Sequence, residues 1–108
     1  MSAPQPLEKQ VERAIREYLA FKGWLTIKSD SGLVNRKDGK PRQEAGIPDL
    51  IALKGDRAIP IEVKTPRGQL SQAQRRYHQT AVDEYGVRVF VVRCIEDAER
   101  LLERLEAS

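Results

Sequence analysis

Two carboxylates and a lysine lie where they could hold a metal ion between them. Asp49 follows Pro48 at the start of an apolar run, and Glu62 and Lys64 flank Val63 at the end of the next run. Two carboxylates that are forced together repel, and the usual remedies are to protonate one or to bind a cation between them. Oxygen ligands favour Mg²⁺ or Mn²⁺, and the Val63 main-chain carbonyl could add a further oxygen. Lys64 beside such an ion could help to deprotonate a water molecule and could stabilise negative charge on a phosphate.

The local elements should bring these groups to one end of a sheet. Residues 49–53 and 58–64 read as two strands joined by a tight turn, which predicts a hairpin. Side chains alternate between the faces of a strand, so Glu62 and Lys64 project to the same side. Because Asp49 begins one strand and Glu62 lies near the end of its antiparallel neighbour, the two carboxylates are expected to meet.

The remaining elements follow from apolar spacing and from capping residues. Tyr18, Phe21 and Trp24 are read as core residues, and Pro60 predicts an exposed edge near the start of its strand. The polar stretch 28–46 is long for a simple connection and indicates a functional loop. In chain order the sequence predicts a helix over 7–22, strands over 24–27, 49–53 and 58–64, a helix over 71–86, a strand over 87–93 and a C-terminal helix from 95.

Length and composition restrict the class of protein. A chain of 108 residues with 40% hydrophobic and 32% charged residues has room for one domain, taken here as residues 1–108. With one cysteine, Cys94, no intrachain disulfide can form. No apolar run approaches the ~18–20 residues that span a bilayer, and the first residues do not read as a signal peptide, so we expect no membrane contact and a cytoplasmic location. The net charge of +3 is unevenly distributed, and basic segments on both sides of an acidic interval suit a polyanion such as DNA.

The order of these motifs resembles the PD-(D/E)xK nuclease superfamily and, within it, the VRR-NUC (virus-type replication-repair nuclease) domain. The resemblance covers nearly the whole chain. It implies an α/β fold with a restriction-endonuclease-like core (αβββαβ), in which a mixed sheet of about four strands is flanked by helices and an extra C-terminal helix follows. The matching stretches are Gly46-Ile47-Pro48-Asp49-Leu50, Ile61-Glu62-Val63-Lys64-Thr65-Pro66-Arg67-Gly68, Leu70-Ser71-Gln72-Ala73-Gln74 and Val91-Val92-Arg93.

The resemblance assigns roles to individual residues. It implies that Asp49 and Glu62 ligate Mg²⁺ or Mn²⁺, with the Val63 carbonyl as a further oxygen, and that Lys64 is the catalytic lysine. Glu12 matches the acidic residue of the first helix and could point toward the metal.

Two of the assigned residues have structural alternatives. Glu12 could simply pair with Arg16 at helical spacing. Gln74 matches the family's glutamine, which orients a metal-bound water or a phosphate, but it could equally complete a capping box with Ser71. His78 is read as an exposed helix residue, because Lys64 already fills the water-activating role.

The implied activity is metal-dependent hydrolysis of phosphodiester bonds in DNA. Stand-alone members of the family are associated with structure-selective cleavage of branched DNA, including four-way junctions, as homodimers. The alternative is a catalytically silent nucleic-acid-binding module with the same fold. Basic residues expected to contact the DNA backbone are Arg36, Lys37, Lys40, Arg42, Arg67, Arg75 and Arg76.

Overall fold

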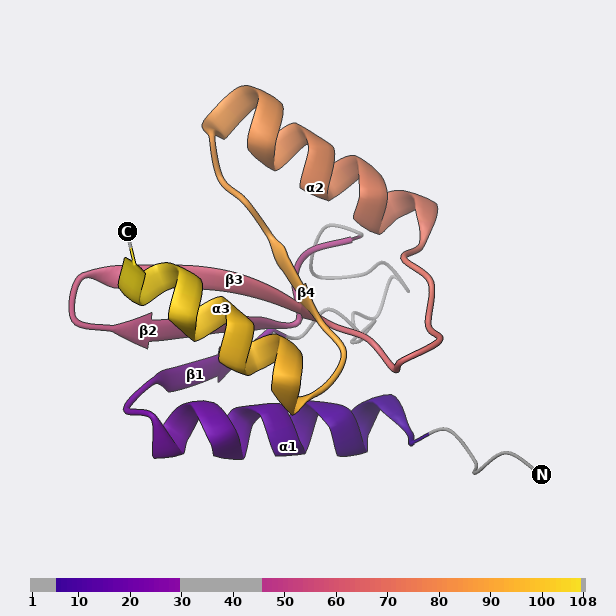
Figure 1. The fold of residues 1–108 in the computed structure, drawn as a ribbon. Helices are drawn as coiled ribbons and strands as arrows, with labels where there is room; N and C mark the ends of the chain where they lie inside the picture. The colour runs from indigo at the N-terminus through magenta and orange to yellow at the C-terminus, as the bar shows by residue number, and fades with distance from the viewer. Residues whose placement is uncertain (1–5, 30–45, 108) are drawn as a thin grey trace, which may run out of the picture.

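Within the described ranges, the chain folds into three helices and four strands in the predicted order (Figure 1). The computed structural model describes residues 6–29 and 46–107. The elements are α1 (Glu8–Phe21), β1 (Leu25–Lys28), β2 (Leu50–Lys54), β3 (Arg57–Val63), α2 (Gln72–Tyr85), β4 (Phe90–Val92) and α3 (Ile95–Ala107).

The strands form one mixed sheet in the order β1-β2-β3-β4. The β1–β2 and β2–β3 pairs are antiparallel, whereas β3 and β4 are parallel. Lys54 pairs with Arg57, which leaves Gly55 and Asp56 as a two-residue turn in which Gly55 has a φ of 60°. Glycine adopts that conformation without steric cost, and the predicted hairpin is confirmed.

Strand β4 is shorter than the predicted strand over 87–93, because only Phe90–Val92 pairs with β3. The N–H of Lys64 donates to the Val92 carbonyl at 3.1 Å. N–H groups alternate sides along a strand, so an N–H at position 60 would also point toward β4. Pro60 has no N–H, and the ladder with β4 therefore ends there. The start of β3 pairs with β2 alone, as Pro60 predicts.

Helices α1 and α3 pack against each other and against one face of the sheet (Figure 1). The residues that build this core recur at three- and four-residue spacing on the helices and at alternate positions on the strands. They are Val11, Ile15, Leu19, Trp24, Leu50, Ala52, Ile61, Val63, Val92, Ala98, Leu101 and Leu102. The core positions Asp49 and Glu62, because each is adjacent in sequence to a buried strand residue.

The prediction that Phe21 is a core residue is wrong. Its side chain is 84% exposed, whereas Trp24 is buried and Tyr18 packs against the core. At 100° per residue, Phe21 lies about 200° around α1 from the buried Leu19, on the opposite face of the helix.

The chain is an α/β protein whose sheet is covered unequally on its two faces. Helix α2 lies on the face opposite α1 and α3 and runs apart from them (Figure 1). Among residues 6–29 and 46–107, no helix combines the length and apolar character needed to cross a bilayer.

Candidate active site

Asp49 is fixed at the open end of the β2–β3 hairpin. It directly precedes β2, and its carbonyl accepts a hydrogen bond from the N–H of Ser29 at 2.8 Å, which continues the pairing beyond β1. Its side-chain Oδ2 accepts a hydrogen bond from the N–H of Val63 at 2.8 Å. The N–H and carbonyl of one strand residue point to the same side, so the Val63 carbonyl also faces the Asp49 side.

Glu62 is the one polar or charged residue that is buried among residues 6–29 and 46–107. Burial, a hydrogen bond with the Asp49 carboxylate and the negative charge of Asp49 together raise the pKa of Glu62 to about 9, against the opposing positive charge of Lys64. The structure therefore brings the two carboxyl groups into direct contact. Without a cation, Glu62 keeps its proton and shares it with Asp49, which is one of the two remedies for paired carboxylates.

Lys64 lies just beyond the end of β3, on the side of the strand that carries Glu62. Its N–H is held by the Val92 carbonyl, and its ammonium group is close enough to oppose the rise in the pKa of Glu62. Burial lowers the pKa of His78, and the charge of Lys64 lowers it further. The lysine is thus placed beside both the carboxyl pair and a side chain of α2.

The loop that follows Lys64 is anchored by Arg93. The guanidinium of Arg93 donates hydrogen bonds to the carbonyls of Thr65, at 2.8 Å, and of Gly68. The backbone N–H of Arg93 donates to Asp97 Oδ2 at 2.9 Å, in the first turn of α3. This residue therefore connects the loop after Lys64 to the end of β4 and the start of α3.

Gln74 completes the capping box that the sequence offers as its structural alternative, and its amide also contacts Glu62. Its Oε1 accepts a hydrogen bond from the N–H of Ser71 at 2.8 Å, and Ser71 Oγ accepts one from the N–H of Gln74 at 3.1 Å, which completes the capping box of α2. Its Nε2 donates to Glu62 Oε2 at 3.2 Å. One amide group thus caps the helix and contacts the buried carboxyl.

The reading of His78 as an exposed residue is wrong. Its side chain is only 15% exposed, and its Nε2 lies 3.4 Å from Glu62 Oε1. His78 follows Gln74 by four residues and so shares its face of α2. That spacing is the sequence signal that indicates a position for His78 near the site.

Helix α1 contributes two carboxylates near this end of the sheet. Glu12 forms an ion pair with Lys28 Nζ at 3.2 Å, while Arg16, the partner considered from the sequence, donates to Thr26 Oγ1 at 3.0 Å. Glu8, which the sequence analysis did not consider, is the α1 carboxylate whose negative charge raises the pKa of Glu62. It precedes Glu12 by one helical turn, and this was the signal that could have found it.

The segment that leads into Asp49 is held close to the start of α2. Gly46 has a φ of 86°, and a Cβ atom there would lie 2.4 Å from the carbonyl oxygen of Ala73. Glycine is required at this position both for the backbone conformation and for the close approach. The contact fixes Asp49 relative to the helix that carries Gln74 and His78.

Of the side chains predicted to bind a cation, the two that contact each other in the described part of the chain are the carboxylates of Asp49 and Glu62. Across residues 6–29 and 46–107, no three His, Cys, Asp or Glu side chains gather as a metal-binding group. Asp49 and Glu62, with the Val63 carbonyl, still fit the chemistry of Mg²⁺, which commonly uses one or two carboxylates and keeps several waters. The raised pKa of Glu62 beside Asp49 shows that a positive charge, whether a proton or a cation, is favourable between the two carboxyl groups.

The comparisons with known proteins identify the family of the chain. The family model described as the VRR-NUC domain matches residues 25–95, which is more than half of the chain. The chain belongs to the VRR-NUC domain family. A solved structure titled "VRR_NUC domain" is similar over 89% of this chain and 94% of that one, with a TM-score of 0.65 and 26% sequence identity. A search of curated proteins finds no match.

The family match covers most of the candidate site of this VRR-NUC domain, a nuclease-type domain. Asp49, Glu62, Lys64 and Gln74 lie within residues 25–95, while Glu8 and Glu12 lie before them. The resemblance noted from the sequence is confirmed, and so is the predicted α/β fold with a four-stranded mixed sheet.

The basic residues expected to contact DNA fall into two groups. Arg36, Lys37, Lys40 and Arg42 lie outside the described residues. Arg67 lies in the loop after Lys64, and Arg75 and Arg76 lie on α2; the side chains of all three are exposed.

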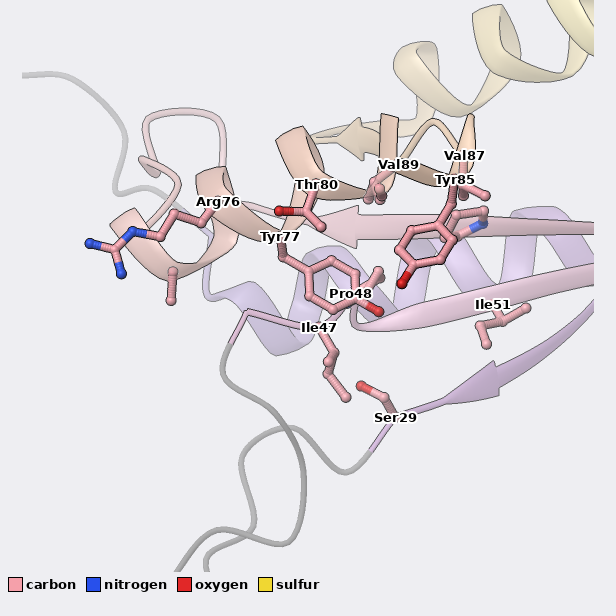
Figure 2. Close-up of a pocket in the computed structure, with 13 residues that line it drawn as sticks. Ser29, Ile47, Pro48, Ile51, Arg76, Tyr77, Thr80, Tyr85, Val87 and Val89 are labelled. Atoms are coloured by element: carbon pink, nitrogen blue, oxygen red, sulfur yellow. The ribbon is translucent and has the colours of Figure 1, made fainter. Parts of the chain in front are cut away.

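A groove of about 890 Å³ separates α2 of the VRR-NUC domain from the sheet. Figure 2 shows the rings of Tyr77 and Tyr85 extending from α2 toward the sheet, with Ile51 across from them and Arg76 pointing outward at one end. The residues that line this groove are largely apolar and include Pro48, the neighbour of Asp49 in the sequence.

Proposed function

We propose that this VRR-NUC domain is a divalent-metal-dependent nuclease that hydrolyses phosphodiester bonds in DNA. The observation that carries the proposal is the contact between the Asp49 and Glu62 carboxyl groups, with Lys64 beside them. A buried carboxyl with its pKa raised to about 9 is costly to ionise, and a cation that binds there would favour the ionised form.

Asp49, Glu62 and the Val63 carbonyl would hold Mg²⁺ or Mn²⁺. A cation held by these residues would supply Lewis-acid polarisation of the scissile phosphate. Asp49 is oriented by the N–H of Val63, and Glu62 by Gln74 and His78, so both carboxylates are positioned before any ligand arrives. Glu12 is paired with Lys28 through Oε2, whereas Glu8 adds negative charge that attracts the cation.

Lys64 would act on the attacking water and on the phosphate. Its place beside Glu62 lets the ammonium group stabilise the negative charge that develops on the phosphate oxygens. Gln74 would orient a water or a phosphate oxygen in addition to holding Glu62.

The exposed arginines Arg67, Arg75 and Arg76 would contact the DNA backbone, together with Arg36, Lys37, Lys40 and Arg42. Contacts to phosphates fix the position of a protein on DNA but read little sequence. We therefore expect cleavage to depend on DNA structure more than on sequence.

A homodimer acting on branched DNA, including four-way junctions, extends the proposal. Exposed apolar side chains lie on β1 and β2 (Leu25, Ile27 and Ile51) and around the end of α2 (Tyr85 and Val87). Exposed apolar patches mark interaction surfaces, and a twofold dimer would supply one site for each of two cuts. Sedimentation equilibrium of the purified protein tests this, and a monomeric mass at working concentration would contradict it.

The deciding experiment incubates single-stranded, duplex, flap and four-way-junction DNA with the protein in Mg²⁺ or Mn²⁺, and sizes the products on a denaturing gel. Asp49→Asn and Lys64→Ala should each lower cleavage by about 10²–10³-fold while the fold is retained. Asp56→Asn makes the same chemical change in the exposed β2–β3 turn and should cleave as the wild type does. Undiminished cleavage by Asp49→Asn would overturn the assignment, and salt-sensitive DNA binding without product would favour the silent binding module.

A further inference from the structure

His78 and Gln74 hold the two oxygens of the Glu62 carboxyl separately. Gln74 Nε2 donates to Oε2 at 3.2 Å, and His78 Nε2 lies 3.4 Å from Oε1. Both side chains come from one face of α2, one helical turn apart. Because each oxygen has a separate partner, the plane of the carboxyl group is fixed rather than free to rotate.

This arrangement leaves Glu62 able to bind a cation. A carboxylate oxygen has two lone pairs, so one hydrogen bond to each oxygen leaves a lone pair on each. The remaining lone pairs can face the Asp49 carboxylate, which already contacts Glu62. An ionised carboxylate only accepts hydrogen bonds, so His78 Nε2 must be the donor when Glu62 is charged.

We propose that His78 is a positioning residue that acts through Glu62: its Nε2–H holds one carboxylate oxygen, Gln74 holds the other, and Glu62 is thereby oriented to bind a divalent cation together with Asp49. The inference rests on the proposed function, because it assigns His78 a task only if Glu62 is a metal ligand. Groups that orient metal ligands in this way contribute about 10–100-fold to metal affinity in other sites.

Three substitutions separate this task from simple packing. His78→Gln keeps an N–H donor at about the reach of Nε2, His78→Asn keeps the amide but shortens the side chain by one methylene, and His78→Leu keeps the bulk but removes the donor. Packing alone would not be expected to favour the glutamine variant over both others. Gln79→Leu, at the exposed neighbouring position on α2, is the matched control.

The measurement is the Kd of Mn²⁺ by isothermal titration calorimetry at one pH, with circular dichroism to check folding and with kcat and KM for cleavage. We expect His78→Leu and His78→Asn to weaken Mn²⁺ binding by about 10-fold, His78→Gln to stay within about 3-fold of the wild type, and Gln79→Leu to be unchanged. Wild-type affinity in folded His78→Leu or His78→Asn overturns the inference and leaves the nuclease proposal standing. If His78→Leu does not fold, the contrast between Asn and Gln decides. Failure of the wild type to bind Mn²⁺ or Mg²⁺ overturns both.

Discussion

The amide of Gln74 connects the N-terminus of α2 to the buried carboxyl of Glu62. Its oxygen accepts from Ser71 and its nitrogen donates to Glu62 Oε2, at 2.8 and 3.2 Å. A residue that completes a helix cap therefore also orients a candidate metal ligand. Formation of the first turn of α2 and the geometry of the site are coupled through one side chain.

Substitution of Gln74 should separate these two roles. Gln74→Glu keeps an oxygen that can accept from Ser71 but loses the donor to Glu62, whereas Gln74→Ala loses both. We expect Gln74→Ala to lower the free energy of unfolding by about 0.5–1.5 kcal/mol for each lost hydrogen bond. Gln74→Glu should retain the cap yet raise the pKa of Glu62 by adding a negative charge beside it. Urea unfolding and DNA cleavage measured on both variants test this, and equal cleavage by Gln74→Glu and wild type would contradict it.

The buried Glu62 predicts how the stability of the metal-free protein depends on pH. Its pKa is about 9 in the folded chain, above the ordinary value of 4.5. Between these values the folded state holds a proton that the unfolded state has released, so stability falls as pH rises through this range. The pKa of His78 is lowered from its ordinary value of 6.5, so near that pH its contribution to stability rises as pH rises. The test is therefore urea unfolding in EDTA between about pH 7.5 and 9, where His78 is neutral in both states. Glu62→Gln should show a flatter dependence, and parallel slopes would contradict the prediction.

The two carboxylates of α1 should differ in their effect on metal binding. The charge of Glu8 acts on Glu62, whereas Glu12 is paired with Lys28. We expect Glu8→Gln to weaken Mn²⁺ binding more than Glu12→Gln, by a few-fold in calorimetry, because the ion pair with Lys28 already offsets the charge of Glu12. Glu17→Gln makes the same change at an exposed position of α1 and serves as the control. A larger loss for Glu12→Gln would show that Glu12 leaves Lys28 and joins the metal site.

The close approach of Gly46 to α2 can be tested by adding one methyl group. In Gly46→Ala the new Cβ would lie 2.4 Å from the Ala73 carbonyl oxygen, in a backbone conformation that disfavours alanine. We expect the free energy of unfolding to fall by about 1–3 kcal/mol. Gly55→Ala has a similar positive φ but no atom within 4 Å, so it isolates the cost of the backbone alone. Equal losses in the two variants would show that the contact with Ala73 contributes nothing.

The parts of the fold that depend on local pattern could be predicted from the sequence. The contact of Asp49 with Glu62 follows from the hairpin. The two-residue turn sets which residues of the two strands lie opposite each other, and the pleat sets the face on which each side chain lies. Helical spacing places His78 on the face of Gln74 and Glu8 one turn from Glu12, but it does not predict their positions relative to Glu62. They depend on how far α2 and α1 are rotated about their own axes when they pack on the sheet, and that rotation is set by contacts distant in sequence. The exposure of Phe21, in contrast, follows from helical spacing, because Phe21 lies about 200° around α1 from the apolar residue Leu19.

Arg93 should stabilise the loop after Lys64 without contributing to metal affinity. Its guanidinium donates to the carbonyls of Thr65 and Gly68, and hydrogen bonds from charged groups contribute about 1.5–3 kcal/mol each. Arg93→Met keeps an unbranched apolar side chain and removes both bonds, so it should lower the urea midpoint clearly. Arg93→Lys should lie between it and the wild type, because Nη1 of Arg93 donates both bonds and the lysine ammonium keeps charged donors on a shorter side chain. Asp49 and Glu62 lie outside this loop, so the Kd of Mn²⁺ should stay within a few-fold of the wild-type value while cleavage falls. A wild-type urea midpoint for Arg93→Met would show that water satisfies the carbonyls of Thr65 and Gly68 equally well. A loss of Mn²⁺ binding that parallels the loss of cleavage would show that the loop supports the proposed metal ligands directly.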